Sequence, residues 1–159
     1  MDGYLSTANN LRKSTQYILL MRAIHQLITV STHGKGTYEI TQAVQEVVWK
    51  SLIQTGIATV FIRHTSASLV TYENADPTAR KDLHAYFDRI VPEHHPNLMH
   101  TMEGPDDATS HLRSALTHTS ETFPIVCGNL TLGVWQGIFV FEHRDAAHSR
   151  VVDMLAIGI

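Results

Sequence analysis

The chain has 159 residues, 43% of them apolar and 17% charged, and a formal net charge of −3, which is the balance of a single globular domain. It has no long basic block, so binding to nucleic acid through phosphate neutralisation is not expected. No apolar run is long enough to span a bilayer, and no signal-peptide pattern is visible. The single cysteine, Cys127, excludes an intrachain disulfide, and we expect a cytoplasmic protein without a membrane partner.

The first half of the chain predicts strands around one helix. Residues 1–20 mix small polar residues with a short apolar end, and we expect a poorly ordered extension before one domain over residues 21–159. Residues 24–32 alternate as a strand does. Residues 38–54 place apolar side chains at helical spacing, and Gly56 stands where a helix stop is expected. The apolar runs at 57–62 and 67–73 predict two more strands.

Two helices are predicted in the middle of the chain. Asp76 and Pro77 form a helix start, because Asp caps free backbone amides and Pro suits the first turn. We expect that helix to bury Leu83, Phe87 and Ile90. After a loop over residues 91–100, Asp106 or Asp107 caps a shorter helix. The inward side chains of this second helix are expected to be Ala108, Leu112, Ala115 and Leu116.

The last part of the chain predicts strands again. Apolar runs suggest strands at 122–126, 130–134, 136–142 and 150–157, with a turn at Gly128 and Asn129. Strands on both sides of helices indicate a single α+β domain with a mixed sheet.

Eleven histidines are the unusual feature of the composition, because histidine is the commonest metal ligand. On a strand, His64 would continue the apolar face of Val60 and Ile62 and stand beside the hydroxyl-rich stretch that contains Ser66 and Ser68. It could be a metal ligand, or it could simply be hydrogen-bonded to those hydroxyls. We expect five others, in polar, loop-like settings, to lie at the surface: His94, His95, His118, His143 and His148.

His100 and His111 form a second candidate. They lie eleven positions apart on a loop and a helix, which alone is a weak metal signal. Glu103, Asp106 and Asp107 stand close by in sequence and strengthen it. Two imidazoles and a third ligand would suit zinc or a similar divalent ion with an open coordination position, although a single such histidine is more often structural.

Polar residues at the ends of two strands form a third candidate. Glu73 and Asn74 end the strand at 67–73, and such a pair can bind polar substrate groups or a hydrated cation. Gln136 stands six positions before Glu142, about 20 Å along an extended strand, so the two cannot bind one ion. Trp135 is a candidate for the core, a subunit interface or substrate stacking.

Several motifs together resemble one family. They are "HTSASL" (64–69), "ENADP" (73–77), "VPE" (91–93), "EGPDD" (103–107), "SHL" (110–112), "LGVWQGI" (132–138) and "EHR" (142–144). In this order, over residues 21–159, they are similar to the YjbQ family, also called UPF0047 and the secondary thiamine-phosphate synthase family. The resemblance implies an α+β subunit whose mixed sheet curls into a half-barrel with helices packed on it, and a homotrimer.

The resemblance also implies a site and an activity. The activity joins hydroxymethylpyrimidine diphosphate to a thiazole phosphate and releases pyrophosphate. The implied ligands of a divalent metal, zinc or magnesium, are His64, His100 and His111. The other expected site residues are Glu73, Asn74, Glu103, Asp106, Asp107, Gln136 and Arg150 as catalytic or ligand-orienting groups, and Ser66, Ser68 and Trp135 as substrate-binding groups.

Three functional hypotheses follow. The first is a transferase that forms thiamine phosphate. The second is a metal-dependent hydrolase of a small phosphorylated or amide-bearing metabolite, with Glu73 or Glu103 as general base. The third is a trimeric metabolite-binding protein without catalysis, in which the histidines bind metal only structurally.

Overall fold

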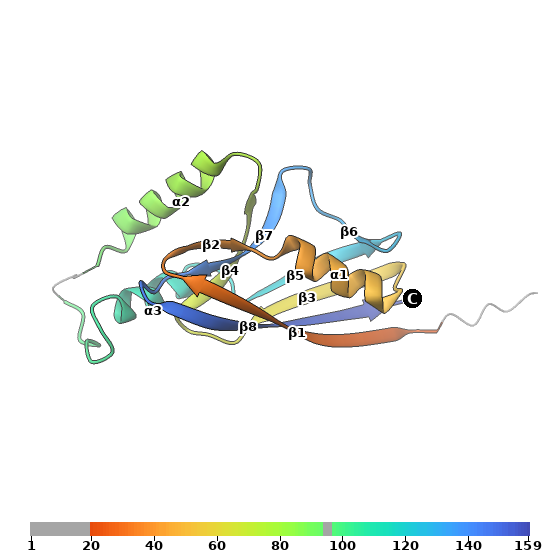
Figure 1. Cartoon of the computed structure of the whole chain (residues 1–159), viewed down its shortest axis with the longest axis horizontal. Helices are drawn as coiled ribbons and strands as arrows, with labels where there is room; N and C mark the ends of the chain where they lie inside the picture. Colours follow the sequence, from red (N-terminus) through yellow and green to blue (C-terminus); the bar gives the residue numbers. More distant parts are fainter. Residues whose placement is uncertain (1–19, 94–96) are drawn as a thin grey trace, which may run out of the picture.

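The computed structural model describes residues 20–93 and 97–159, so most of the expected N-terminal extension, residues 1–19, and the predicted surface residues His94 and His95 lie outside the described residues. The elements follow one another in the order drawn in Figure 1: β1 (Arg22–His33), β2 (Gly36–Glu39), α1 (Thr41–Ser51), β3 (Thr55–Ile62), β4 (Ala67–Glu73), α2 (Pro77–Ile90), α3 (Asp107–Ala115), β5 (Ser120–Val126), β6 (Asn129–Leu130), β7 (Gln136–Glu142) and β8 (Ala147–Gly158).

The strands form two sheets that meet along one edge. One has the order β1-β8-β3-β5-β6 and the other β2-β7-β4. A bridge between Leu69 and His118 joins them, so the whole curls into the expected half-barrel and the α+β fold is confirmed. One detail of the expectation is wrong: each pairing between the named strands is antiparallel, so the sheet is not mixed. Among these pairs only β5 and β6 are consecutive strands, so the antiparallel order arises mostly from strands that are distant in the sequence.

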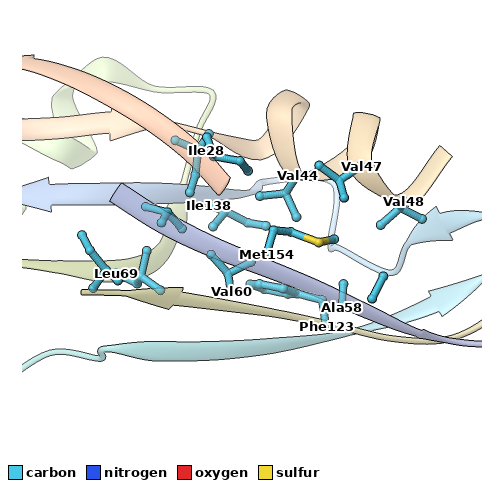
Figure 2. Packing of buried hydrophobic residues seen from close by; sticks show 14 of the residues in the cluster. Ile28, Val44, Val47, Val48, Ala58, Val60, Leu69, Phe123, Ile138 and Met154 are labelled. Atoms are coloured by element: carbon cyan, nitrogen blue, oxygen red, sulfur yellow. The ribbon is translucent and has the colours of Figure 1, made fainter. Parts of the chain in front are cut away.

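The apolar core lies between α1 and the sheets. Figure 2 shows Val44, Val47 and Val48 of α1 turned toward Met154 of β8. All four are at most 1% exposed. Burying each side chain of this kind contributes about 1.5–3 kcal/mol, which makes α1 the helix that closes the barrel. Helix α2 packs on β7 through Phe87, whose ring centroid lies 5.1 Å from that of Phe141.

The end of α1 differs from the prediction. The helix stops at Ser51, and Leu52 takes the left-handed conformation with φ 59°. Gly56 belongs to β3, opposite Gly158 of β8. A Cβ atom on Gly56 would lie 2.1 Å from the carbonyl oxygen of Ile157. Gly56 is therefore required by the close approach of two strands and not by a helix stop.

The start of α2 is confirmed. The Asp76 carboxylate accepts a hydrogen bond from the Thr78 amide at 2.8 Å, and Pro77 occupies the first helical position. Of its expected buried residues Phe87 is buried, whereas Ile90 is 43% exposed. None of the helices among the described residues is long and apolar enough to cross a membrane.

The buried face of α3 differs from the predicted one, since Ala108 is buried as expected but the other three predicted residues are exposed. Leu112 and Leu116 are 46% and 61% exposed. The inward face is polar, and its Ser110 hydroxyl lies 2.8 Å from the backbone oxygen of His143. Asp106 stands at the N-cap but makes no capping bond, because its carboxylate accepts the Asp145 amide instead. The helix is thus held by buried hydrogen bonds; its buried members are Asp107, Ala108, Thr109, Ser110, Arg113 and Ser114.

Candidate metal centre

The start of α3 brings two histidines and an aspartate together. Asp107 and His111 are one helical turn apart and share a face, and the loop before the helix delivers His100. Asp107 Oδ2 lies 2.7 Å from His100 Nε2 and 3.2 Å from His111 Nε2. The three potential ligand atoms all lie within 4.8 Å of one another. Among the described residues this is the group with the arrangement of a metal site.

A backbone contact fixes the orientation of His111. Its Nδ1 atom lies 2.9 Å from the carbonyl oxygen of Thr65. A carbonyl oxygen can only accept, so Nδ1 carries a proton. In neutral imidazole the lone pair of Nε2 then points at the Asp107 carboxylate. Two acceptors face each other only with a positive charge between them, which is either a proton or a bound cation.

The second oxygen of Asp107 contacts Arg144. Arg144 Nη1 donates to Asp107 Oδ1, and its Nε donates to Asp106 Oδ2 at 3.1 Å. Burial alone would raise the pKa of Asp106, but the Asp145 amide and Arg144 outweigh it and lower that pKa. No local pattern marks Arg144 as a site residue; its signal in the sequence is its place in "EHR", two residues after the buried strand β7.

His64 lies beside this group and not within it. It lines a pocket of about 530 Å³ together with Thr65, His111 and Ser114. Its Nε2 atom accepts the backbone amide of Val151 at 2.9 Å. Burial and the nearby Arg150 lower its pKa. A neutral His64 therefore carries its proton on Nδ1 and has no lone pair left for an ion in this arrangement.

A buried ion pair between Arg150 and Glu142 lies next to the turn that follows His64. Arg150 donates to Glu142 from Nε at 2.6 Å and from Nη2 at 2.5 Å, and also contacts the Ser66 hydroxyl at 3.2 Å. Glu142 is fully buried and Arg150 is 4% exposed. Burial alone would raise the pKa of Glu142, yet the bonds from Arg150, the Arg144 amide and Thr32 hold it below its ordinary value. The guanidinium of Arg150 is thus neutralised within the chain.

Ser68, an expected substrate-binding residue, points into the interior. It is fully buried, and its hydroxyl lies 2.9 Å from His143 Nε2 and 2.6 Å from Thr117 Oγ1. The expectation that His143 lies at the surface is wrong, since it is 1% exposed. Burial, reinforced by Arg113, lowers the pKa of His143 to about 3. His143 follows β7 directly, and the buried strand carries this histidine inward.

The remaining predicted site residues lie at the far end of the β4–β7 ladder. Glu73 pairs with Gln136, and Ala67 with Glu142 six residues away, which is about 20 Å. Glu73 Oε1 accepts the amides of Ala75 and Asp76, and Gln136 Oε1 accepts that of Gly133.

Asn74 and Trp135 lie at this same end, where the Asn74 amide donates to the Trp135 carbonyl. The Trp135 side chain is 62% exposed, so it is not part of the core of this chain. Glu103 is exposed, and its backbone oxygen accepts a bond from Arg144. The fold of the chain therefore does not bring Glu73, Asn74, Trp135 and Gln136 to the histidines.

The fold and the cluster define a small α+β half-barrel protein with a two-histidine, one-carboxylate group at a helix start. Residues 26–158 match the family model described as UPF0047 protein YjbQ-like. The chain belongs to this family, as its motifs implied. A UPF0047 protein of Synechocystis is 47% identical over 131 residues, which cover 82% of this chain and 89% of the relative. The protein YjbQ of Escherichia coli O157:H7 is 36% identical over 124 residues, covering 77% and 89%.

Solved structures agree with the fold. A YbjQ-like protein of unknown function from Sulfolobus solfataricus superposes with a TM-score of 0.78 at 27% identity, covering 88% of this chain and all of the other. A conserved hypothetical protein from Thermus thermophilus gives 0.73 at 32% identity, covering 81% and 97%. These relatives establish the family and the architecture, and their names state no activity.

Proposed function

We propose that the chain binds a divalent transition-metal ion through His100, Asp107 and His111. The observation that carries this proposal is the geometry of neutral His111: its Nδ1–H donates to the Thr65 backbone oxygen, so the lone pair of Nε2 faces the buried carboxylate of Asp107. A cation between them removes the conflict. Two imidazoles and one carboxylate are ligands that zinc accepts, whereas magnesium prefers oxygen ligands. Of the two ions expected from the sequence, the donor set therefore favours zinc, with Asp107 in place of His64.

Metal analysis of protein purified without a histidine tag tests the ion. A tag-free route is necessary because eleven native histidines can take nickel from a column. We expect about one equivalent of zinc per chain, and loss of it in His100→Ala and His111→Ala. His118→Ala is the matched control, since His118 is exposed and pairs only with Glu121. Equal metal content in wild type and all three variants would contradict the proposed site.

The proposed reaction is the formation of thiamine phosphate from hydroxymethylpyrimidine diphosphate and a thiazole phosphate, with release of pyrophosphate. The pocket beside His111, about 530 Å³, has the size of a small-molecule site. A bound ion would stabilise the charge that develops on the departing diphosphate. His64, which lines the pocket, offers its Nδ1–H to a phosphate oxygen. Arg150 is already paired with Glu142, so we assign it a structural role, in which it also donates to the Ser66 hydroxyl next to the pocket-lining Thr65.

Hydrolysis of a phosphorylated metabolite is the second candidate. The observation in its favour is the open side of the cluster: the side chains of His100 and His111 are 53% and 36% exposed, which leaves room for water. An assay of the tag-free protein with the two thiamine precursors, beside a panel of phosphoesters, separates the candidates. Thiamine phosphate supports the transferase; metal-dependent phosphoester turnover without it supports the hydrolase. If neither forms and His111→Ala only lowers thermal stability, the site is structural.

We further propose a homotrimer. Large apolar side chains are left exposed on the outer side of the five-stranded sheet, among them Leu27, Ile57, Phe61, Val126 and Leu155, and such patches are typical of interfaces. Glu73 and Gln136 pair at the opposite end of the β4–β7 ladder from Glu142, about 20 Å away along the strand, so we expect them to join a site only through a neighbouring subunit. Light scattering of wild type and Phe61→Asp tests the assembly; a monomeric wild type would contradict it. A cytoplasmic setting remains part of the same proposal.

A further inference from the structure

We infer that Arg144 is a positioning residue, which holds Asp107 in the orientation that a metal ion requires. The inference rests on the proposed metal site and assigns a role to a residue outside the ligand set. It also explains why the carboxylate ligand, 1% exposed, is so deeply buried beside two much more exposed histidines.

The backbone of Arg144 is fixed from behind by a buried carboxylate. Its amide donates to Glu142 Oε1 at 3.0 Å, and Glu142 is itself held by both Arg150 bonds. Glu142 ends β7 and Arg150 lies in β8. The backbone of Arg144 is thus anchored, through Glu142 and Arg150, to one strand of each sheet. Its side chain can therefore fix the position of the residues that it contacts.

The guanidinium binds three groups in the turn over residues 103–107. It donates to the Glu103 backbone oxygen at 2.8 Å, to Asp106 Oδ2 at 3.1 Å and to Asp107 Oδ1. These contacts clamp the segment that leads into α3. They also divide the oxygens of Asp107: Oδ1 is taken by Arg144, and Oδ2 is left toward His100 and His111. Groups that orient a ligand in this way change metal affinity by about 10–100-fold when removed.

Two effects of Arg144 on a metal ion have opposite signs, which makes the inference testable. As a positive charge close to a cation site, Arg144 repels the ion, so by charge alone its removal would strengthen metal binding. As a positioning residue it fixes the ligand, so its removal weakens metal binding. Lysine keeps the charge but loses the planar fork. Charge alone therefore predicts no change for Arg144→Lys, whereas positioning predicts weaker binding.

The experiment is a titration of metal-free, tag-free protein with Co²⁺, followed by its visible absorption, for wild type, Arg144→Gln and Arg144→Lys. We expect affinity to fall about 10–100-fold in Arg144→Gln, with a smaller fall in Arg144→Lys and an altered absorption band in both. Arg113→Gln is the matched control: this buried arginine lies on α3 but contacts Asp88 and the Val91 backbone oxygen, so we expect unchanged binding.

The outcomes separate this inference from the proposed function. If wild type takes up no Co²⁺, the metal site itself is wrong. If wild type binds and Arg144→Gln binds equally or more tightly, only the role of Arg144 is overturned. Should Arg144→Gln not fold, as judged by circular dichroism, Arg144→Lys decides: affinity equal to wild type contradicts the positioning role, and a loss supports it.

Discussion

The Nδ1 atom of His111 lies 2.9 Å from the backbone oxygen of Thr65, 46 positions earlier in the chain. This contact ties α3 to the turn between β3 and β4. It also fixes the tautomer of neutral His111: the carbonyl can only accept a hydrogen bond, so Nδ1 carries the hydrogen and Nε2, which faces Asp107, carries the lone pair. The chemistry proposed for this protein follows from that one orientation.

Asp107→Asn tests the carboxylate of the cluster without changing its size. We expect zinc affinity to fall by at least about 100-fold, because a neutral amide replaces the anionic ligand. Isothermal titration of tag-free protein measures it. The control is Asp88→Asn, since Asp88 pairs with Arg113 away from the cluster; equal losses in both variants would show a general effect on α3.

Glu142→Gln tests the buried ion pair. Arg150 would keep its charge in a buried position without a full counter-charge, so we expect about 3–5 kcal/mol less stability in urea unfolding. Glu121→Gln, which removes the partner of the exposed His118, should cost less than about 1 kcal/mol. A loss for Glu142→Gln no greater than that of this control would mean that the pair adds nothing to the fold.

The buried His143 predicts how stability depends on pH. Its folded pKa is about 3, below the unfolded value near 6.5, so the unfolded state binds a proton that the folded state does not. This contribution to stability is present above about pH 6.5 and is lost as the pH falls toward 3, at up to about 1.4 kcal/mol per pH unit. His64 and His84, whose pKa values are also lowered by burial, act in the same direction.

His143→Phe isolates that term, because the new ring can keep the packing against Phe141 and Phe87. Urea unfolding between pH 4.5 and 7 should show a slope smaller by about 1.4 kcal/mol per pH unit below pH 6. His118→Phe, at an exposed position, should keep the wild-type slope. An unchanged slope in His143→Phe would mean that this ring is protonated in the folded protein.

Gly56→Ala tests the close approach of β3 and β8. A Cβ atom there meets the Ile157 backbone oxygen at 2.1 Å, so the strands must separate. We expect a loss of about 1–3 kcal/mol, measured by urea unfolding. Gly133→Ala is the comparison: its Cβ would meet only the flexible side chain of Gln136 at 3.3 Å, and we expect a smaller loss.

Local patterns in the sequence predicted much of the fold. The strands at 67–73 and 136–142 and the helix start at Asp76 agree with the structure, because strand alternation and helix capping depend on neighbouring residues. The error in the inward face of α3 has the same origin: local apolar spacing depends only on neighbouring residues and does not show which distant groups the helix will meet. Apolar Leu112 and Leu116 suggested burial, but polar groups distant in the sequence, such as the backbone oxygen of His143 just after β7, meet the other face.

The site was predictable only in part. "EGPDD" and the spacing of His100 and His111 drew attention to the start of α3, where the cluster is found. The contact between Arg144 and Asp107 joins residues 37 positions apart, and no local pattern encodes it. Nor could strand spacing reveal that the Val151 amide occupies His64 Nε2, since this depends on how β3 and β8 pair.

Anomalous diffraction at the zinc edge, on crystals of tag-free protein, would locate the proposed ion itself. We expect one peak per chain, about 2.0–2.2 Å from His100 Nε2, Asp107 Oδ2 and His111 Nε2. A zinc peak bound elsewhere, or crystals grown with zinc in which these three side chains keep their direct contacts and no peak lies among them, would contradict it.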